Sequence, residues 1–488
     1  MEAIVAAIAS DITNRSISYV IRKYSEMTGP KVDDLRLKDL QRLLDRVHVI
    51  VNEAEGRVIT NQAMVHLLNI MRKEMYRGYF TMDSLRSQAN NKAKDHDVSH
   101  SFAPSHYKPA KRRHFSNDGV NWNKELQQVI HNLSNIIADA KEFLVFLENY
   151  PPLYRQPYDM HLFIGKCMFG RQMEVERIMD FLMQTAHPSM RNVAVLPIVG
   201  PGYVGKCTLV AHVYNDARVR NHFSQIVIIN GDKISDDALA SLKHGCVIKY
   251  QNNALAGENG RVLAVIEFSE NLDKVPWNSF YLSFLQCLAS GSKIIITSNS
   301  GKIKKFGTTQ ALVLNFLPQE AFWYFFKVLT FGSADSKYHP KLESVAMTMA
   351  REMGGSFIAA NFISAVLRRN LSAQHWGRCL AAFRVNIQRN VSVFGEHPCN
   401  LLQKQKHARY QINEDKYMVS DQYHAYLSTD DVPKITMYDI VVGNVNCEGS
   451  FEILAWKSHI LPYKSYTINC MIHEEQRIKR KNDIEGNC

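Results

Sequence analysis

Apolar residues in the first 150 positions recur at steps of three and four, which is the spacing of one buried face of a helix. Four such stripes stand out, over residues 4–12, 37–54, 65–82 and 126–144. The last of them stops before Pro151-Pro152, where a helix would end. Amphipathic helices must bury their apolar faces on one another. The pattern therefore predicts an N-terminal four-helix bundle over residues 1–150.

One segment within this region and one directly after it are not expected to be part of the packed helices. Residues 87–118 contain little that could be buried, and we expect a flexible loop inside the bundle there. Residues 151–170 are predicted to be a linker that leads into the next domain.

Between residues 171 and 316 the pattern changes to short β-branched runs separated by helical stretches. The expected strands are 193–199, 225–229, 247–250, 262–266, 293–297 and 311–315. This alternation predicts an α/β domain with a parallel sheet and helices on both faces. Ligands of such sheets bind beyond the carboxyl ends of the strands. We therefore expect Gly200–Thr208, Glu267 and Thr297–Asn299 to lie along one edge.

The remaining residues are predicted to be helical first and β-rich afterwards. Residues 317–390 read as a small helical domain, with Gly354-Gly355 ending one of its helices. Residues 391–488 form a poorly defined C-terminal region, with strands expected at about 433–470 and a basic tail.

A candidate phosphate-binding loop follows the first expected strand. It consists of Gly200, Pro201, Gly202, Tyr203, Val204, Gly205, Lys206, Cys207 and Thr208. Glycines let a backbone wrap around an anion, the start of the next helix supplies N–H groups, and Lys206 supplies a positive charge. The segment satisfies the pattern G-x-x-x-x-G-K-[ST] except at its last position, which is Cys207.

The sequence offers fewer suitable side chains for binding Mg²⁺ than for binding phosphate. A thiol such as Cys207 is a poor Mg²⁺ ligand, because Mg²⁺ prefers oxygen donors. Thr208 would point about 100° away from the site on a helix. Glu267, at the end of a strand, is the candidate metal-binding or water-orienting carboxylate, and a solvated strand end is the alternative interpretation. The loop is thus suited to holding a nucleotide and less suited to hydrolysing one.

Composition narrows the class of protein. The 488 residues carry 58 Lys and Arg against 47 Asp and Glu, a net charge of +11 that permits acidic partners without indicating one. No specific nucleic-acid partner is predicted. The nine cysteines form no Cys-x-x-Cys pair, which argues against a zinc site or a disulfide framework. No apolar run is long enough for a transmembrane segment, so we expect a protein of the cytoplasm, with nuclear or membrane-peripheral locations as alternatives.

Taken in order, these motifs resemble those of plant NB-ARC disease-resistance proteins of the coiled-coil (Rx-like N-terminal) type. The resemblance covers about residues 1–390 and is to a short form lacking leucine-rich repeats. Besides the phosphate loop, the matching segments are Val213–Asp216, His222-Phe223, the Walker B strand Leu263–Glu267, the strand Gly291–Thr297 before the sensor arginine, Leu317–Glu320 and Gly354-Gly355.

Several positions depart from the family pattern. Cys207 replaces the loop hydroxyl, Phe268 replaces the second Walker B acid, and Asn299 stands where the sensor arginine is expected. We interpret Asn299 as a polar loop residue rather than a γ-phosphate sensor. Gly355–Ile358 replaces a Gly-Leu-Pro-Leu turn, and only two acids remain in the acidic motif of the bundle, Glu74–Asp83.

The resemblance implies an ADP/ATP-binding protein of plant innate immunity, a nucleotide-dependent signalling switch or helper, with Mg²⁺ as a further candidate ligand. The departures indicate weak or absent ATP hydrolysis, so we expect no enzyme beyond a vestigial ATPase. The alternative is a nucleotide-free scaffold or decoy that acts through its helical bundle. Expected partners are other NB-ARC/leucine-rich-repeat resistance proteins or signalling proteins, and self-association is a further expectation.

Overall fold

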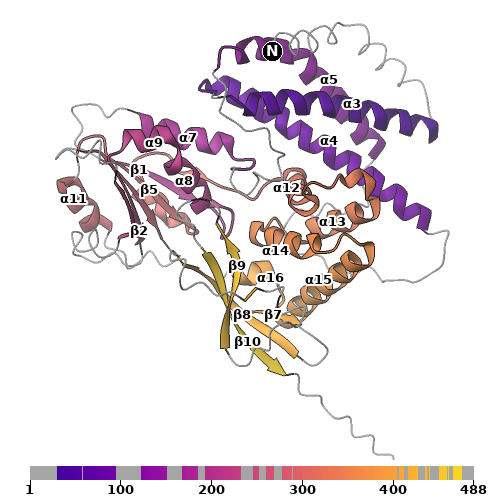
Figure 1. Cartoon of the computed structure of the whole chain (residues 1–488). Helices are drawn as coiled ribbons and strands as arrows, with labels where there is room; N and C mark the ends of the chain where they lie inside the picture. The colour runs from indigo at the N-terminus through magenta and orange to yellow at the C-terminus, as the bar shows by residue number, and fades with distance from the viewer. Residues whose placement is uncertain are drawn as a thin grey trace, which may run out of the picture. The chain divides into compact units, whose positions relative to one another are not determined.

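Figure 1 shows the computed structural model of the chain. The structure describes residues 30–57, 59–94, 122–150, 168–184, 193–231, 246–251, 260–268, 277–287, 289–403, 406–411, 416–426, 435–436, 439, 450–458, 460 and 465–474. The described residues up to Ala360 form one compact unit, and those from Asn361 onward form a second. The expected helical domain 317–390 spans this division, so its boundaries stay a prediction.

Three long helices of the first unit pack on one another. They are α3 (Pro30–Glu55), α4 (Gln62–Lys94) and α5 (Trp122–Leu147). Their interior is formed by the predicted stripes, and Leu44, Val47, Val129 and Leu133 are fully buried. The fourth expected stripe, residues 4–12, lies outside the described residues. So does most of the expected linker, 151–167.

The expected loop 87–118 was wrong in its first part. Helix α4 continues through residues 87–94 to Lys94. This stretch has few apolar residues, but it contains no Gly or Pro, and its Gln, Ala and Lys residues have good intrinsic helix propensity. An established helix can therefore extend through it on intrinsic propensity. Residues 95–118 lie outside the described part.

The α/β domain contains a six-stranded sheet in the order β3-β2-β4-β5-β1-β6. Its strands are β1 (Ala194–Val199), β2 (Gln225–Asn230), β3 (Cys246–Gln251), β4 (Val262–Glu267), β5 (Lys293–Ser298) and β6 (Leu312–Val313). Strands β2, β4, β5, β1 and β6 run parallel to one another, as predicted.

Edge strand β3 corrects the expectation of a fully parallel sheet, because it pairs with β2 in the antiparallel direction. A run of β-branched residues indicates a strand but not its direction. Antiparallel edge strands on otherwise parallel sheets are common. The expected helix before this strand, near 234–243, lies outside the described residues.

Helices cover both faces of the sheet, with α11 (Trp277–Cys287) on one side and α7 (Gln172–Met183), α8 (Lys206–Asn215) and α9 (Ala217–His222) on the other (Figure 1). Burial on both faces explains why the strands read as continuous apolar runs rather than as alternating ones. The parallel register pairs Val199 with Ser298 and Glu267 with Thr297. The carboxyl ends of β1, β4 and β5 therefore lie at one edge, as predicted.

Helices after the sheet complete the first unit. They are α12 (Gln319–Phe331), the short 3₁₀ helix η6 (Ser336–Tyr338), α13 (Pro340–Glu352) and the start of α14 (Phe357–Arg368). Both α12 and α13 pack against α4 of the bundle, which joins residues about 240 positions apart in the sequence.

The second unit contains α15 (Ala373–Phe394), α16 (Pro398–Gln403) and an antiparallel sheet in the order β7-β8-β10-β9. Two of these strands, β9 (Ser450–Lys457) and β10 (Ser465–Glu474), fall in the predicted β-rich segment. The other two, β7 (Ala408–Gln411) and β8 (Lys416–Tyr426), begin before it and were not predicted. Their polar and aromatic composition carries little strand signal without a partner strand.

None of the described helices is both long enough and apolar enough to cross a membrane.

The bundle offers a matched test of its packing in two valines of α3. Val47 is fully buried and Val49 is 48% exposed. We expect Val47→Ala to lower the free energy of unfolding by about 2 kcal/mol, because it removes two buried carbon atoms and leaves a cavity. Val49→Ala should be neutral or slightly stabilising, since alanine has the higher helix propensity. Urea denaturation of both variants measures the difference, and equal effects would contradict the described packing.

Candidate nucleotide-binding site

The turn between β1 and α8 has the backbone geometry of an anion-binding loop. Gly205 caps α8 in the left-handed conformation, with φ 91°. Tyr203, with φ 59°, is the non-glycine residue of the described chain that also has a positive φ. Gly200 is required for a different reason, since a Cβ atom there would lie 2.5 Å from the carbonyl oxygen of Leu314. The chain thus turns sharply between a buried strand and a helix N-terminus.

Lys206 stands at the first position of α8, and its side chain folds back under the loop. Its ammonium donates hydrogen bonds to the carbonyl oxygens of Gly200 and Pro201, both at 2.8 Å, and to Oδ1 of Asn299 at 2.7 Å. The residue is 7% exposed. A positive charge is therefore held directly beneath the turn, where phosphate oxygens could compete for it as charged acceptors.

Asn299 has a more specific place than the sequence indicated. It follows the last residue of β5, and its side-chain oxygen contacts the loop lysine directly. The sequence interpretation as a polar loop residue missed this contact. The available signal was its position one residue beyond a strand that pairs with β1.

The N-terminal end of α8 adds a second source of positive potential. The first amides of a helix have no partner within the helix, and the helix dipole places a partial positive charge there. In the described chain α8 has ten residues, enough for this dipole to develop, and its start coincides with Lys206. Backbone and side chain therefore favour the same kind of ligand, an anion such as a nucleotide phosphate.

The oxygen donors expected for Mg²⁺ are sparse. Glu267 ends β4 and pairs in register with Thr297 and with Asn230. Cys207 and Thr208 are partly exposed on the first turn of α8, and Cys207 is not in a disulfide. Within the described residues, no three His, Cys, Asp or Glu side chains gather closely enough to hold a metal ion. The donor set therefore fits a phosphate better than it fits Mg²⁺.

Phe268, at the position of the missing acid, belongs to the core. It is 6% exposed, and its ring lies 6.2 Å from the rings of both Trp277 and Phe306. Gly231 makes room for it, because a Cβ atom there would lie 2.2 Å from the Phe268 ring. The sequence identified this residue as a lost carboxylate. The structure adds that an apolar cluster has formed around the replacement.

The turn after α13 also reaches the phosphate loop. Gly354 and Gly355 both have positive φ angles, 64° and 79°, which lets the chain reverse into α14. The ring of Phe357 then comes within 3.9 Å of the point where a Gly205 Cβ would stand, and the Met168 side chain within 4.0 Å. Gly355–Ile358 is thus beside the loop, although it lacks the proline of the family motif.

Sequence comparison identifies relatives of one kind. The chain is 23% identical over 354 residues to the disease resistance protein RGA2 of Solanum bulbocastanum, covering 69% of this chain and 35% of that protein. It is 26% identical to the putative disease resistance protein RGA1 of the same plant, covering 52% and 27%. It is 22% identical to the putative disease resistance RPP13-like protein 1 of Arabidopsis thaliana, covering 71% and 34%.

All three relatives are disease resistance proteins, and the chain is similar to them over 52–71% of its length. The chain spans about a third of the length of these relatives, so what the whole proteins do is only proposed for it. No protein-family model matches it.

Solved structures resemble this chain weakly. A structure of Drosophila ORC bound to DNA has a TM-score of 0.32 at 13% identity, and covers 53% of this chain and 82% of that one. Domain III of the Thermotoga maritima replication initiation protein DnaA has a TM-score of 0.24 at 15% identity, and covers 50% and 93%. Similarity at this level supports no argument, and the fold rests on the strand order described above.

Phe268 generates a prediction about stability. Restoring the family acid with Phe268→Asp should lower the free energy of unfolding by at least about 3 kcal/mol, because it empties an aromatic site and buries a carboxylate. Phe268→Leu, the matched apolar control, should cost less, on the order of 1–2 kcal/mol. Denaturant unfolding measures both. Equal losses in the two variants would show that the ring is not packed as described.

Proposed function

We propose that the chain binds a nucleoside diphosphate, ADP, at the β1–α8 loop, and that it acts in plant defence as a nucleotide-dependent switch or helper. The observation that carries this proposal is the position of Lys206, whose buried ammonium is held under a glycine-rich turn at the start of α8. The three acceptors described above are neutral oxygens, and a diphosphate would supply anionic ones, which make stronger hydrogen bonds. The similarity to disease resistance proteins supports the role in defence.

ATP would occupy the same loop, but three features oppose its hydrolysis. Phosphoryl transfer requires Mg²⁺, an oriented water and positive charge at the γ-phosphate. Here the loop hydroxyl is Cys207, the second strand-end acid is the core residue Phe268, and the neutral Asn299 stands at the end of β5. Loss of a single charge-stabilising group commonly costs about 10²- to 10³-fold in rate. We therefore propose slow turnover or none.

A nucleotide-free scaffold is the second candidate function, and one observation favours it. The Lys206 ammonium already donates to three protein acceptors, so the loop keeps its shape through contacts within the chain. Under this alternative, the helical bundle would carry the contacts with partner resistance proteins. The nucleotide content of the purified full chain separates the two candidates, because a switch with a tight ADP site would carry ADP from the cell.

ADP binding is the decisive measurement. We expect isothermal titration calorimetry to give a Kd on the order of micromolar, about −8 kcal/mol. Lys206→Ala should abolish binding, since it removes the ammonium that lies beneath the turn. Lys304→Ala is the matched control, because Lys304 is an exposed lysine on the 3₁₀ helix η5 (Gly301–Phe306) that follows β5. Equal affinity in the wild type and in Lys206→Ala would refute the proposed site.

Hydrolysis is tested with Glu267, the remaining strand-end carboxylate. We expect phosphate release from ATP at the background rate, and no change in Glu267→Gln, because Cys207, Phe268 and Asn299 stand at the other positions that hydrolysis would use. Lys206→Ala provides the blank for contaminating activity. Turnover above this blank that falls in Glu267→Gln would instead identify a working NTPase.

A further inference from the structure

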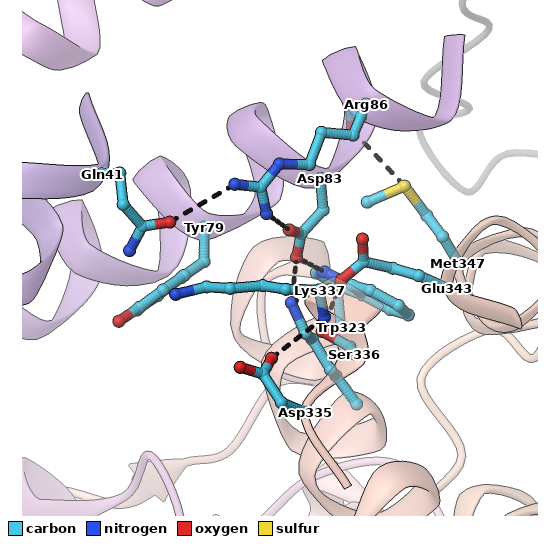
Figure 2. Close-up of polar contacts among 12 residues, drawn as sticks. Gln41, Tyr79, Asp83, Arg86, Trp323, Asp335, Ser336, Lys337, Glu343 and Met347 are labelled. Atoms are coloured by element: carbon cyan, nitrogen blue, oxygen red, sulfur yellow. Dashed lines mark hydrogen bonds and ion pairs between the residues drawn. The ribbon is translucent and has the colours of Figure 1, made fainter. Parts of the chain in front are cut away.

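A cluster of buried charges joins α4 to α12 and α13 (Figure 2). Oδ2 of Asp83 on α4 accepts hydrogen bonds from the indole Nε1 of Trp323 and from the ammonium of Lys327 on α12, both at 2.8 Å. The same ammonium lies 2.7 Å from Oε1 of Glu343 on α13, which also accepts from the Ser336 hydroxyl at 2.8 Å. Three helices therefore meet on one lysine.

The hydrogen-bonded ionisable groups of this cluster, Asp83, Lys327 and Glu343, include two carboxylates and one ammonium. Asp83 is fully buried and Glu343 is 3% exposed, yet both carboxylates share the Lys327 ammonium. With both ionised, the three groups carry a net charge of −1. A buried charge without full compensation is costly, since its loss of hydration exceeds what a shared partner returns. A carboxylate in this position is stabilised by taking up a proton.

The neighbouring groups compensate this imbalance only through a long ion pair. On α4, the buried Nη1 of Arg86 lies 3.9 Å from Oδ1 of Asp83, beyond hydrogen-bond distance. Oδ1 is buried and accepts no hydrogen bond in the described part of the chain. From α3, the neutral Gln41 contacts Arg86, whose Nη2 donates to its Oε1 at 3.4 Å. The other ionisable or charged groups around the cluster are Tyr79 on α4, Asp335 and Lys337 on or beside η6, and Arg351 on α13, which contacts Ser84 and the ring of Phe80.

Burial determines the direction of the titration. Desolvation raises the pKa of Asp83, Lys327 lowers it, and Glu343 raises it again, so that the net shift is upward. For Lys327, burial alone would lower the pKa, but the carboxylates of Asp83 and Glu343 raise it, and the ammonium stays charged. Asp83 is therefore the group of this cluster whose pKa is raised towards the protonated form.

We propose that Asp83 takes up one proton when α4 packs on α12 and α13, so that this cluster holds the helical bundle on these helices more firmly at low pH than at high pH. The oxygen Oδ1, which accepts no hydrogen bond, is the atom on which the proton would reside. Because the pKa is raised in the packed state, the stabilisation is complete below the ordinary carboxyl pKa and is lost as pH rises through the raised one.

Hydrogen exchange of the full chain tests this proposal, followed by mass spectrometry from about pH 5 to pH 9, the range in which buried carboxyls can titrate. After correction for the intrinsic exchange rate, the opening equilibrium of α4, α12 and α13 should rise by up to about tenfold per pH unit while one proton is released. Strands β1, β4 and β5 provide the internal control and should show no such rise. Equal pH dependence in both regions would overturn the proposal.

Two variants sharpen the test. Asp83→Asn copies the protonated side chain, so its three helices should stay as protected at high pH as those of the wild type at low pH. Glu125→Gln is the control, because Glu125 pairs with Arg77 of α4 at 2.8 Å in a partly exposed ion pair between α4 and α5. It should keep the wild-type pH dependence. An unchanged slope in Asp83→Asn would also overturn the proposal, and if that variant does not fold, the wild-type comparison of helices with strands decides.

Discussion

The buried ammonium of Lys206 is the interaction on which the candidate site depends. Two loop carbonyls and one amide oxygen turn towards its charge and stabilise it. Turning those carbonyls inward requires a tight reversal after β1, which Gly200 and the left-handed Gly205 allow. It also requires the end of β5 beside the end of β1, because Asn299 supplies the third acceptor. The position of Lys206 therefore depends on both the shape of the loop and the order of the strands.

The same edge of the sheet shows how apolar packing has replaced charge. At the end of β4 one carboxylate remains and the next residue, Phe268, faces an aromatic cluster with Trp277 and Phe306. That replacement contributes to the core of the domain while it removes a ligand that metal-dependent chemistry would use. Stability and phosphate binding are therefore compatible here, whereas hydrolysis loses a group at each altered position. This is the physical basis for proposing a binding protein rather than an enzyme.

Charged side chains are buried where helix α4 of the bundle packs on α12 and α13. Asp83, Lys327 and Glu343 come from three helices, and they are buried where apolar side chains would pack at lower cost. Such a cluster makes the contact specific, since the lysine has to meet two carboxylates and the indole N–H of Trp323 has to meet one. It also makes the contact sensitive to protonation. The phosphate loop and this cluster both belong to the first compact unit.

Hydrophobic periodicity along the sequence was sufficient to locate α3, α4, α5, the strands β1 to β6 and the phosphate loop, because each depends on local spacing or on a short motif. The grouping of the loop with Glu267 and Thr297–Asn299 also followed, since parallel strands bring their carboxyl ends together. Local pattern did not determine the direction of β3, the length of α4 or the existence of β7 and β8. Strand direction and pairing depend on partners elsewhere in the chain, and helix ends depend on intrinsic propensity as well as on an apolar face.

Tertiary structure alone decided what individual side chains do. Asn299 became a partner of Lys206, Phe268 became a core residue, and Asp83 met Lys327, which is 244 positions away in the sequence. A sequence records which groups are present, but burial and distance set the free energy of each charge. The sequence by itself determined that this protein has a phosphate-type loop on a parallel sheet. The folded structure determined which partners the charged side chains of that loop and of the helices α4, α12 and α13 contact.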